Sequence, residues 1–179
     1  MEYFDILNEN GELSGERASD KEVHEKGLLH RVVHVWFLNS KGEVLLQKRA
    51  KDRYAYPGHW DMSVGGHVTA GDTSIDTAIK ETREELGITL PASAFELIFR
   101  SRDNFVTNNG TYVVNEFQDV YLVRSDMRVE EFSISHEEVE EVRFVPLRTF
   151  EEWVAERREG IVPHIEEYRR LFAYLSEVK

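Results

Sequence analysis

The chain has 179 residues, of which 41% are hydrophobic and 11% aromatic, so it can bury one core and global disorder is excluded. Its formal net charge of −12 argues against a nonspecific nucleic-acid binder, because such proteins need a basic surface. The absence of cysteine excludes disulfides, thiolate metal sites and cysteine nucleophiles. Neither a signal peptide nor a membrane-spanning segment is visible, so we expect a cytoplasmic protein.

Runs of β-forming residues, turn signals and helical periodicity predict strands with helices between them. The predicted strands, in chain order, are Tyr3–Leu7, Val32–Leu38, Glu43–Arg49, Asp61–Val64, Phe95–Val106, Tyr112–Val123 and Glu140–Val145. The predicted helices are Thr73–Leu86, Phe150–Arg158 and His164–Val178. This order predicts an α/β fold with a mixed sheet and helices packed on it.

No linker or repeat divides the chain, so we predict a single domain over residues 1–179. Residues 1–28 would be an N-terminal extension with a β-hairpin, and residues 146–179 would contain the C-terminal helices. The apolar side chains of these last helices would cover either the core or a partner in a homodimer. They are Trp153, Tyr168, Leu171, Phe172 and Leu175.

The helix Thr73–Leu86 carries the strongest chemical signal. Thr73 is a suitable N-cap and Gly87 a suitable C-terminal stop. Glu81, Glu84 and Glu85 have the spacing i, i+3 and i+4, which we expect to place three carboxylates on one face. At about 5–6 Å and an effective dielectric near 20, each such pair repels by roughly 3 kcal/mol. A divalent cation would relieve this repulsion; a solvated acidic face is the alternative.

Two glycines, Gly65 and Gly66, follow the predicted strand Asp61–Val64 and precede this helix in a loop. Glycine lets a backbone carbonyl or amide approach a ligand or metal closely. An ordinary tight turn is the alternative, although it would need one glycine and not two. The glycines therefore favour a metal or phosphate site next to the helix.

These residues resemble the Nudix box, whose pattern is Gly, five residues, Glu, seven residues, then Arg-Glu-aliphatic-any-Glu-Glu-any-Gly-aliphatic. The matching residues are Gly66, Glu81, Glu84, Glu85, Gly87 and Ile88. Asp72 and Lys80 replace the first acid and the arginine with like charges, and Thr82 replaces an aliphatic residue. Lysine lacks the planar fork of arginine, so the departure at Lys80 bears on metal affinity and rate.

The similarity extends over about residues 4–145 and is greatest to the Nudix branch that includes isopentenyl-diphosphate isomerase. The segments that carry it are His30–Trp36, Leu45–Arg49 and Tyr56–Asp61. That isomerase binds a metal through histidines and glutamates outside the box, and His30, His67 and Glu116 fall where such ligands are expected, with His24 in approximate position. It also needs a cysteine where this chain has Val64-Gly65-Gly66-His67, so hydrolysis is favoured over isomerisation.

The resemblance implies a Nudix-type α/β/α sandwich and a metal-dependent hydrolase that cleaves a phosphoanhydride bond in a nucleoside diphosphate linked to another group. An isomerase-like enzyme of prenyl diphosphates and a noncatalytic diphosphate-binding module are the alternatives. The implied metal ligands are Glu81, Glu84, Glu85, Gly65 and Glu116, which would hold Mg²⁺ or, alternatively, Mn²⁺.

The substrate would be a small-molecule diphosphate, bound by Arg49, Arg53, Gly66 and His67. Glu81, Glu84, Glu85 and Glu116 are the expected catalytic residues. The base that assists the attacking water is left open between Glu81, Glu116 and the loop residues Glu137 and Glu138, with Glu116 ranked above the loop pair. Aromatic residues that could stack on a base are Trp60, Phe105 and Tyr112, although core packing is the alternative for each.

Overall fold

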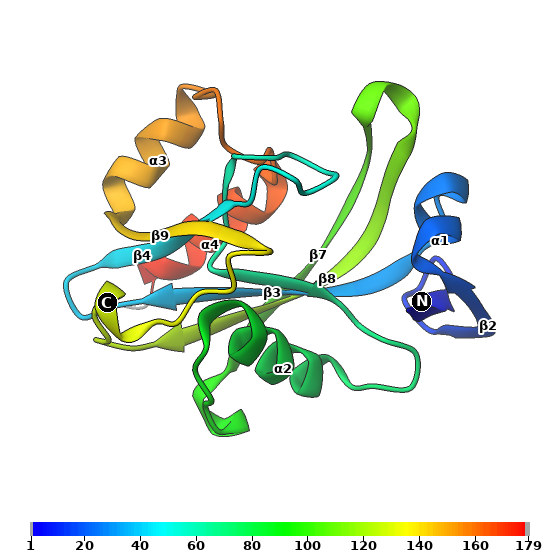
Figure 1. The fold of residues 1–179 in the computed structure, drawn as a ribbon, viewed down its shortest axis with the longest axis horizontal. Coiled ribbons are helices and arrows are strands. Elements are labelled where there is room, and N and C mark those ends of the chain that lie inside the picture. The colour runs from blue at the N-terminus through cyan, green and yellow to red at the C-terminus, as the bar shows by residue number, and fades with distance from the viewer. Residues whose placement is uncertain (1, 178–179) are drawn as a thin grey trace.

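The computed structural model describes residues 2–177, in which a mixed seven-stranded sheet lies between helices (Figure 1). The strands of this sheet are β3 (His30–Leu38), β4 (Glu43–Arg49), β5 (Trp60–Asp61), β6 (Val64–His67), β7 (Glu96–Thr107), β8 (Tyr112–Arg124) and β9 (Val139–Pro146). Their order is β5-β4-β3-β8-β7, with β6 paired to β3 and β9 paired to β4. Only β3 and β8 pair in parallel, so the predicted mixed sheet is confirmed.

Helices on both faces complete a three-layer sandwich. Helix α2 (Ser74–Leu86) covers one face and shares a core cluster with Val33 and Val35 of β3. Helices α3 (Leu147–Ala155) and α4 (Ile165–Glu177) cover the other face, where Trp36 is completely buried. The predicted α/β/α sandwich is confirmed, and the apolar side chains of α3 and α4 pack on the sheet.

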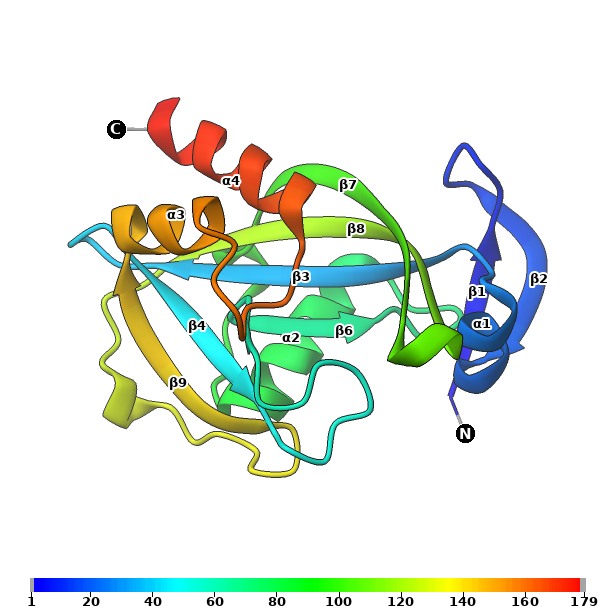
Figure 2. The same cartoon turned by 90° about the horizontal axis from the view of Figure 1, so that it is seen from above.

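Strands β3 and β4 are joined by a tight turn but diverge after it (Figure 2). The only residues that pair between them are Leu38 and Val44, next to the turn. Beyond this point β6 pairs with β3, while β5 and β9 pair with β4. The divergence opens the middle of the sheet, where side chains from β3, β4 and β6 line a shared space.

The N-terminal segment forms a small unit at one end of the sheet, whereas α3 and α4 lie toward the other (Figures 1 and 2). It comprises β1 (Tyr3–Leu7), β2 (Leu13–Ser19) and α1 (Asp20–Lys26). The hairpin agrees with prediction, but α1 was not predicted. Its local signal is a capping box, in which Ser19 and Glu22 bond each other's backbone amides.

Three other expectations need correction. Gly65 and Gly66 do not lie in a loop: they belong to β6 and pair with His34 and Val33 of β3. Helix α3 begins at Leu147 and ends at Ala155, before Arg157, which has a left-handed φ of 51°. Helix α4 begins at Ile165 and is described to Glu177, so the predicted end at Val178 lies outside the described residues.

Candidate metal and diphosphate site

On one face of the sheet the side chains are polar along one half of the strands and apolar along the other half. The residues of β3 on this face run His30, Val32, His34 and Trp36, and their neighbours on β8 include Glu116, Gln118 and Val120. The apolar half lies under α3 and α4 in the core. The polar half faces a cavity of about 930 Å³, a volume suited to a nucleotide-sized ligand. Burying polar groups costs free energy, so this polar half of the face indicates a binding site.

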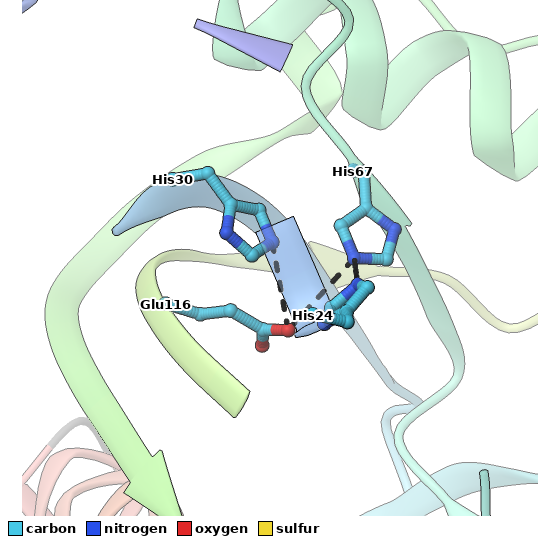
Figure 3. A group of neighbouring side chains, drawn as sticks. All are labelled: His24, His30, His67 and Glu116. Carbon is cyan, nitrogen blue, oxygen red and sulfur yellow. Dashed lines mark hydrogen bonds and ion pairs between the residues drawn. The ribbon is translucent and has the colours of Figure 1, made fainter. Parts of the chain in front are cut away.

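Four side chains lie close together, and three of them line this cavity: His24 of α1, His67 of β6 and Glu116 of β8, with His30 of β3 beside them (Figure 3). One ligand atom from each lies within 4.8 Å of the others. His24 Nε2 is 3.2 Å from His67 Nε2, and Glu116 Oε1 is 3.8 Å from Nε2 of both His30 and His67. We call these four residues the histidine cluster.

Backbone carbonyls fix the orientation of two of these rings. His30 Nδ1 donates to the carbonyl of Leu28 at 2.8 Å, and His24 Nδ1 donates to that of Val113 at 3.1 Å. His30 therefore presents an Nε2 lone pair to the cluster, as metal-ligating histidines do, whereas Nε2 of His24 accepts from the Tyr112 hydroxyl at 2.8 Å, a bond that a cation would replace. His30 Nε2 is buried and has no hydrogen-bond partner. The donor set thus fits a divalent cation.

Protonation states in the cluster also suit a cation. Burial lowers the pKa of His30 to about 4, and it lowers the pKa values of His24 and His67 as well. Burial raises the pKa of Glu116 to about 7. The rings are therefore neutral, as metal ligands must be, and for Glu116 the effect of burial outweighs that of the nearby positive charges, which favour the ionised carboxylate.

The Nudix-box carboxylates form a second wall. Glu81 and Glu84 line the cavity. Glu85 was expected on the same face of the helix, but it is only 3% exposed and points into the protein. Glu85 accepts hydrogen bonds from Gln47 Nε2 at 3.0 Å and from the Gly65 amide at 3.4 Å. Glu81 lies against the backbone of Gly66, where a Cβ would stand only 2.4 Å from its Cγ. Gly66 is thus needed for close approach rather than for a turn.

Burial raises the pKa of Glu81 to about 7 and that of Glu85 well above its usual value. Neighbouring carboxylates, including that of Glu138, act in the same direction on both. These raised values mean that the protein alone does not compensate the negative charge that ionisation of these carboxylates creates, a role that a bound cation would fill. Oxygen donors of this kind suit Mg²⁺ or Mn²⁺.

The predicted phosphate-binding arginines also line the cavity. Arg49 pairs with Asp61 at 3.2 Å and Arg53 pairs with Glu138 at 2.9 Å, and all four residues line the cavity. Of the box departures, Lys80 lies at the cavity, 4.0 Å from Glu2, whereas Asp72 lies outside it. Phe105 and Tyr112 line the cavity, but Trp60 does not and instead carries Arg143 on its ring.

Sequence reasoning missed a buried network on the cavity floor. His164, which precedes α4, donates from Nδ1 to Asp103 at 2.8 Å and lies 3.4 Å from Asp61. Although burial opposes it, these carboxylates raise the pKa of His164 well above its usual value. Nearby, His34 Nδ1 lies 2.5 Å from Glu167 of α4. No local pattern marks these residues, because their partners are far apart in sequence.

Carboxylates from helix α2 and the histidine cluster share one cavity. This combination is typical of a protein that binds an anionic substrate through divalent cations. The family model described as the NUDIX domain matches residues 28–165. Nudix hydrolase 3 of Arabidopsis thaliana is 42% identical over 98% of this chain, which spans 23% of that protein's length. A Nudix hydrolase of Listeria monocytogenes is 37% identical, covering 89% of this chain and 87% of its own.

Similarity to the isomerase branch is present at lower identity. The isopentenyl-diphosphate Delta-isomerase of Cutibacterium acnes is 31% identical over 80% of this chain and 73% of its own. A crystal structure of a Deinococcus radiodurans protein shares the fold, with a TM-score of 0.71 and 23% identity over 94% of this chain and 98% of its own. The chain belongs to the Nudix family and is a hydrolase of that family. No helix among residues 2–177 is long and apolar enough to cross a membrane.

Proposed function

We propose that the protein cleaves the phosphoanhydride bond of a nucleoside diphosphate linked to another group, by attack of water on phosphorus. The observation that carries this proposal is one cavity that joins three kinds of group. Glu81 and Glu84 line it, as do His24, His67 and Glu116 of the histidine cluster, and as do Arg49 and Arg53. Cationic and metal-binding groups around one cavity suit a diphosphate.

In this mechanism Glu81, Glu84 and Glu85, with the carbonyl of Gly65, would hold Mg²⁺, and Glu116 would join the histidines. Glu85 would have to exchange its hydrogen bonds from Gln47 and the Gly65 amide for the cation. A bound cation neutralises diphosphate charge and lowers the pKa of a coordinated water. Arg49 and Arg53 contact phosphate oxygens, and the Gly66 backbone and His67 border the same space. Glu81 and Glu116, with pKa values raised to about 7 by burial, are suited to accept the proton of the attacking water.

The histidine cluster contains more imidazole than Mg²⁺ prefers. Of the two cations expected here, Mn²⁺ is a transition ion and accepts imidazole nitrogen more readily than Mg²⁺, which prefers oxygen ligands. We therefore propose Mn²⁺ for the cluster and Mg²⁺ for the carboxylate wall. His24, His30 and His67 thereby extend the predicted ligand set beyond Glu116.

The test is turnover of a diphosphate panel by protein freed of metal with a chelator and then supplied with Mg²⁺ or Mn²⁺. We expect release of a nucleotide or phosphate, and loss of that release in Glu85→Gln without loss of fold by circular dichroism. Glu130→Gln is the matched control, because Glu130 is exposed on a loop away from the cavity. Full activity of Glu85→Gln would exclude the mechanism. Tight binding without product would favour a binding module.

One observation supports a second candidate. The histidine cluster resembles the metal ligands of the isomerase branch, so isopentenyl diphosphate belongs in the panel. Without any cysteine in the chain, protonation of the alkene lacks the acid that the isomerase needs. We expect no isomerised product; its appearance would replace the hydrolase proposal with the isomerase-like one.

A further inference from the structure

Four aromatic side chains from two separate chain segments line the cavity. Tyr54 and Tyr56 lie on the loop after β4, Phe105 lies on β7 and Tyr112 begins β8, and all four line the cavity. We call these four residues the aromatic rim. In both overall views the loop lies beside the tip of the β7–β8 hairpin (Figures 1 and 2). The rim is therefore made by two chain segments that face each other.

Direct contacts join the two sides of the rim. Tyr54 Oη lies 3.0 Å from Thr111 Oγ1, and Asn108 Nδ2 donates to the Tyr54 carbonyl at 2.8 Å. The rings of Tyr54 and Tyr112 have centroids 5.5 Å apart, and those of Tyr56 and Phe105 have centroids 6.4 Å apart. Because the rim is already assembled, a ligand entering it loses little affinity to ordering the protein.

Both segments contain backbone conformations that are unfavourable for their residues. Tyr56 has a φ of 50°, which is uncommon for a bulky side chain, and Asn108 and Asn109 have φ values of 51° and 55°. The left-handed conformation is easier for asparagine than for tyrosine. Strained conformations of this kind are concentrated at ligand-binding sites. In this chain the strained residue Tyr56 lines the cavity.

The rim continues the proposed diphosphate site outward. The loop that carries Tyr54 also carries Arg53, and Arg49 precedes it at the end of β4. A diphosphate between these arginines and the carboxylate wall would have its organic group within reach of the rim. The chain order thus places the cationic residues before the aromatic ones, on one short segment.

The character of the rim favours one kind of organic group. Tyr54 is 63% exposed, so a hydrocarbon chain lying on it would remain largely in water. The hydroxyl groups of Tyr54 and Thr111 also interrupt the apolar surface, whereas that of Tyr112 is bonded to His24. A flat ring with polar edges can stack on an exposed aromatic face while its edges stay hydrated or bonded to hydroxyls.

We propose that the aromatic rim binds the heteroaromatic base of a nucleotide substrate by stacking, and that Tyr54 is its principal contact. This inference rests on the proposed function, because it assigns the base of that substrate to a place. It predicts that rim residues determine affinity for the base and leave affinity for the diphosphate unchanged.

The test compares the dissociation constants of ADP and inorganic pyrophosphate, each with Mg²⁺, by calorimetry. Tyr54→Ala should weaken ADP binding by about 5- to 150-fold, the range for loss of one base–aromatic stack. It should leave pyrophosphate binding unchanged. Tyr54→Phe keeps the ring and should bind ADP like the parent protein. Tyr3→Ala is the control, since Tyr3 is an exposed tyrosine outside the cavity.

Several results would overturn the inference. Equal weakening of ADP and pyrophosphate would show that Tyr54 only shapes the cavity. A Tyr54→Phe defect as large as that of Tyr54→Ala would assign the effect to the hydroxyl and not to stacking. If Tyr54→Ala weakens geranyl diphosphate and spares ADP, the rim binds hydrocarbon. Rim-dependent ADP binding without hydrolysis of any nucleotide would contradict the proposed function and leave the rim assignment standing.

Discussion

At the scale of single residues, Gly66 links the Nudix box to the sheet. Its missing side chain lets the carboxylate of Glu81 lie against the backbone of β6, with the position of a Cβ only 2.5 Å from Glu81 Cδ. Its neighbour Gly65 differs, because a Cβ there would meet the flexible Met62 side chain at 3.2 Å. Two adjacent glycines therefore carry different constraints, and a matched pair of variants can separate them.

We expect Gly66→Ala to displace Glu81 and reduce turnover at least tenfold, with a stability loss of about 1–3 kcal/mol from overpacking. Gly65→Ala should have the smaller effect on both, because Met62 can move. Turnover and urea denaturation of the two variants measure this. If both variants keep full turnover, Glu81 does not need its position against Gly66.

At the scale of elements, α4 is attached to the sheet by charge as well as by apolar packing. Glu167 is completely buried and accepts from Trp36 Nε1 at 2.7 Å and from His34 Nδ1 at 2.5 Å. Removing one partner of a buried pair leaves the other desolvated and unpaired. The position of α4 on the sheet therefore depends on the carboxylate of Glu167, which binds β3 where its polar and apolar halves meet.

Glu167→Ala should destabilise the fold by about 3–5 kcal/mol, the usual cost of breaking a buried pair. The adjacent Glu166 is exposed and pairs only with Arg169, so Glu166→Ala should leave the midpoint of urea denaturation unchanged. Equal midpoints for the two variants would show that the His34 and Trp36 bonds contribute little to stability.

How far the elements could be predicted depends on how local their determinants are. Helix α2 was predicted closely because Thr73 caps it, Gly87 ends it and its apolar residues recur at helical spacing. The orientation of its carboxylates was predicted only in part. Glu85 points into the protein because it accepts a hydrogen bond from Gln47, which is distant in sequence. The place of Gly65 in a strand likewise depends on pairing with β3, which no local pattern encodes.

At the scale of the whole molecule, the cavity gathers residues from the full length of the chain. His24 precedes the segment matched by the family model, residues 28–165, and His164 stands near the end of that segment. Sequence reasoning recovered His30, His67 and Glu116 through resemblance, and it placed His24 only approximately because α1 was not predicted. The network around His164 was not predicted, since Asp61 and Asp103 reach it from separate strands.

Because the histidine cluster is buried, the stability of the metal-free protein depends on pH. The pKa of His30 is lowered to about 4 by burial, against an ordinary value of 6.5. The unfolded chain therefore binds a proton at His30 between these values and the folded protein does not. Above pH 6.5 the proton affinity of His30 does not affect the free energy of unfolding. As the pH falls below 6.5 it lowers that free energy, by about 2 kcal/mol at pH 5.

We therefore expect chelator-treated protein to lose more stability between pH 7.5 and pH 5 than its His30→Gln variant, by about 2 kcal/mol in urea denaturation. Mn²⁺ binds only the folded cluster with neutral rings, so saturating Mn²⁺ should raise stability, and more at pH 7.5 than at pH 5. His30→Gln should lose most of that gain, whereas Mg²⁺ acting through the carboxylate wall should stabilise both proteins alike. An equal Mn²⁺ gain in both proteins would mean that His30 is not a ligand, because the cation would then be bound by groups that the variant retains.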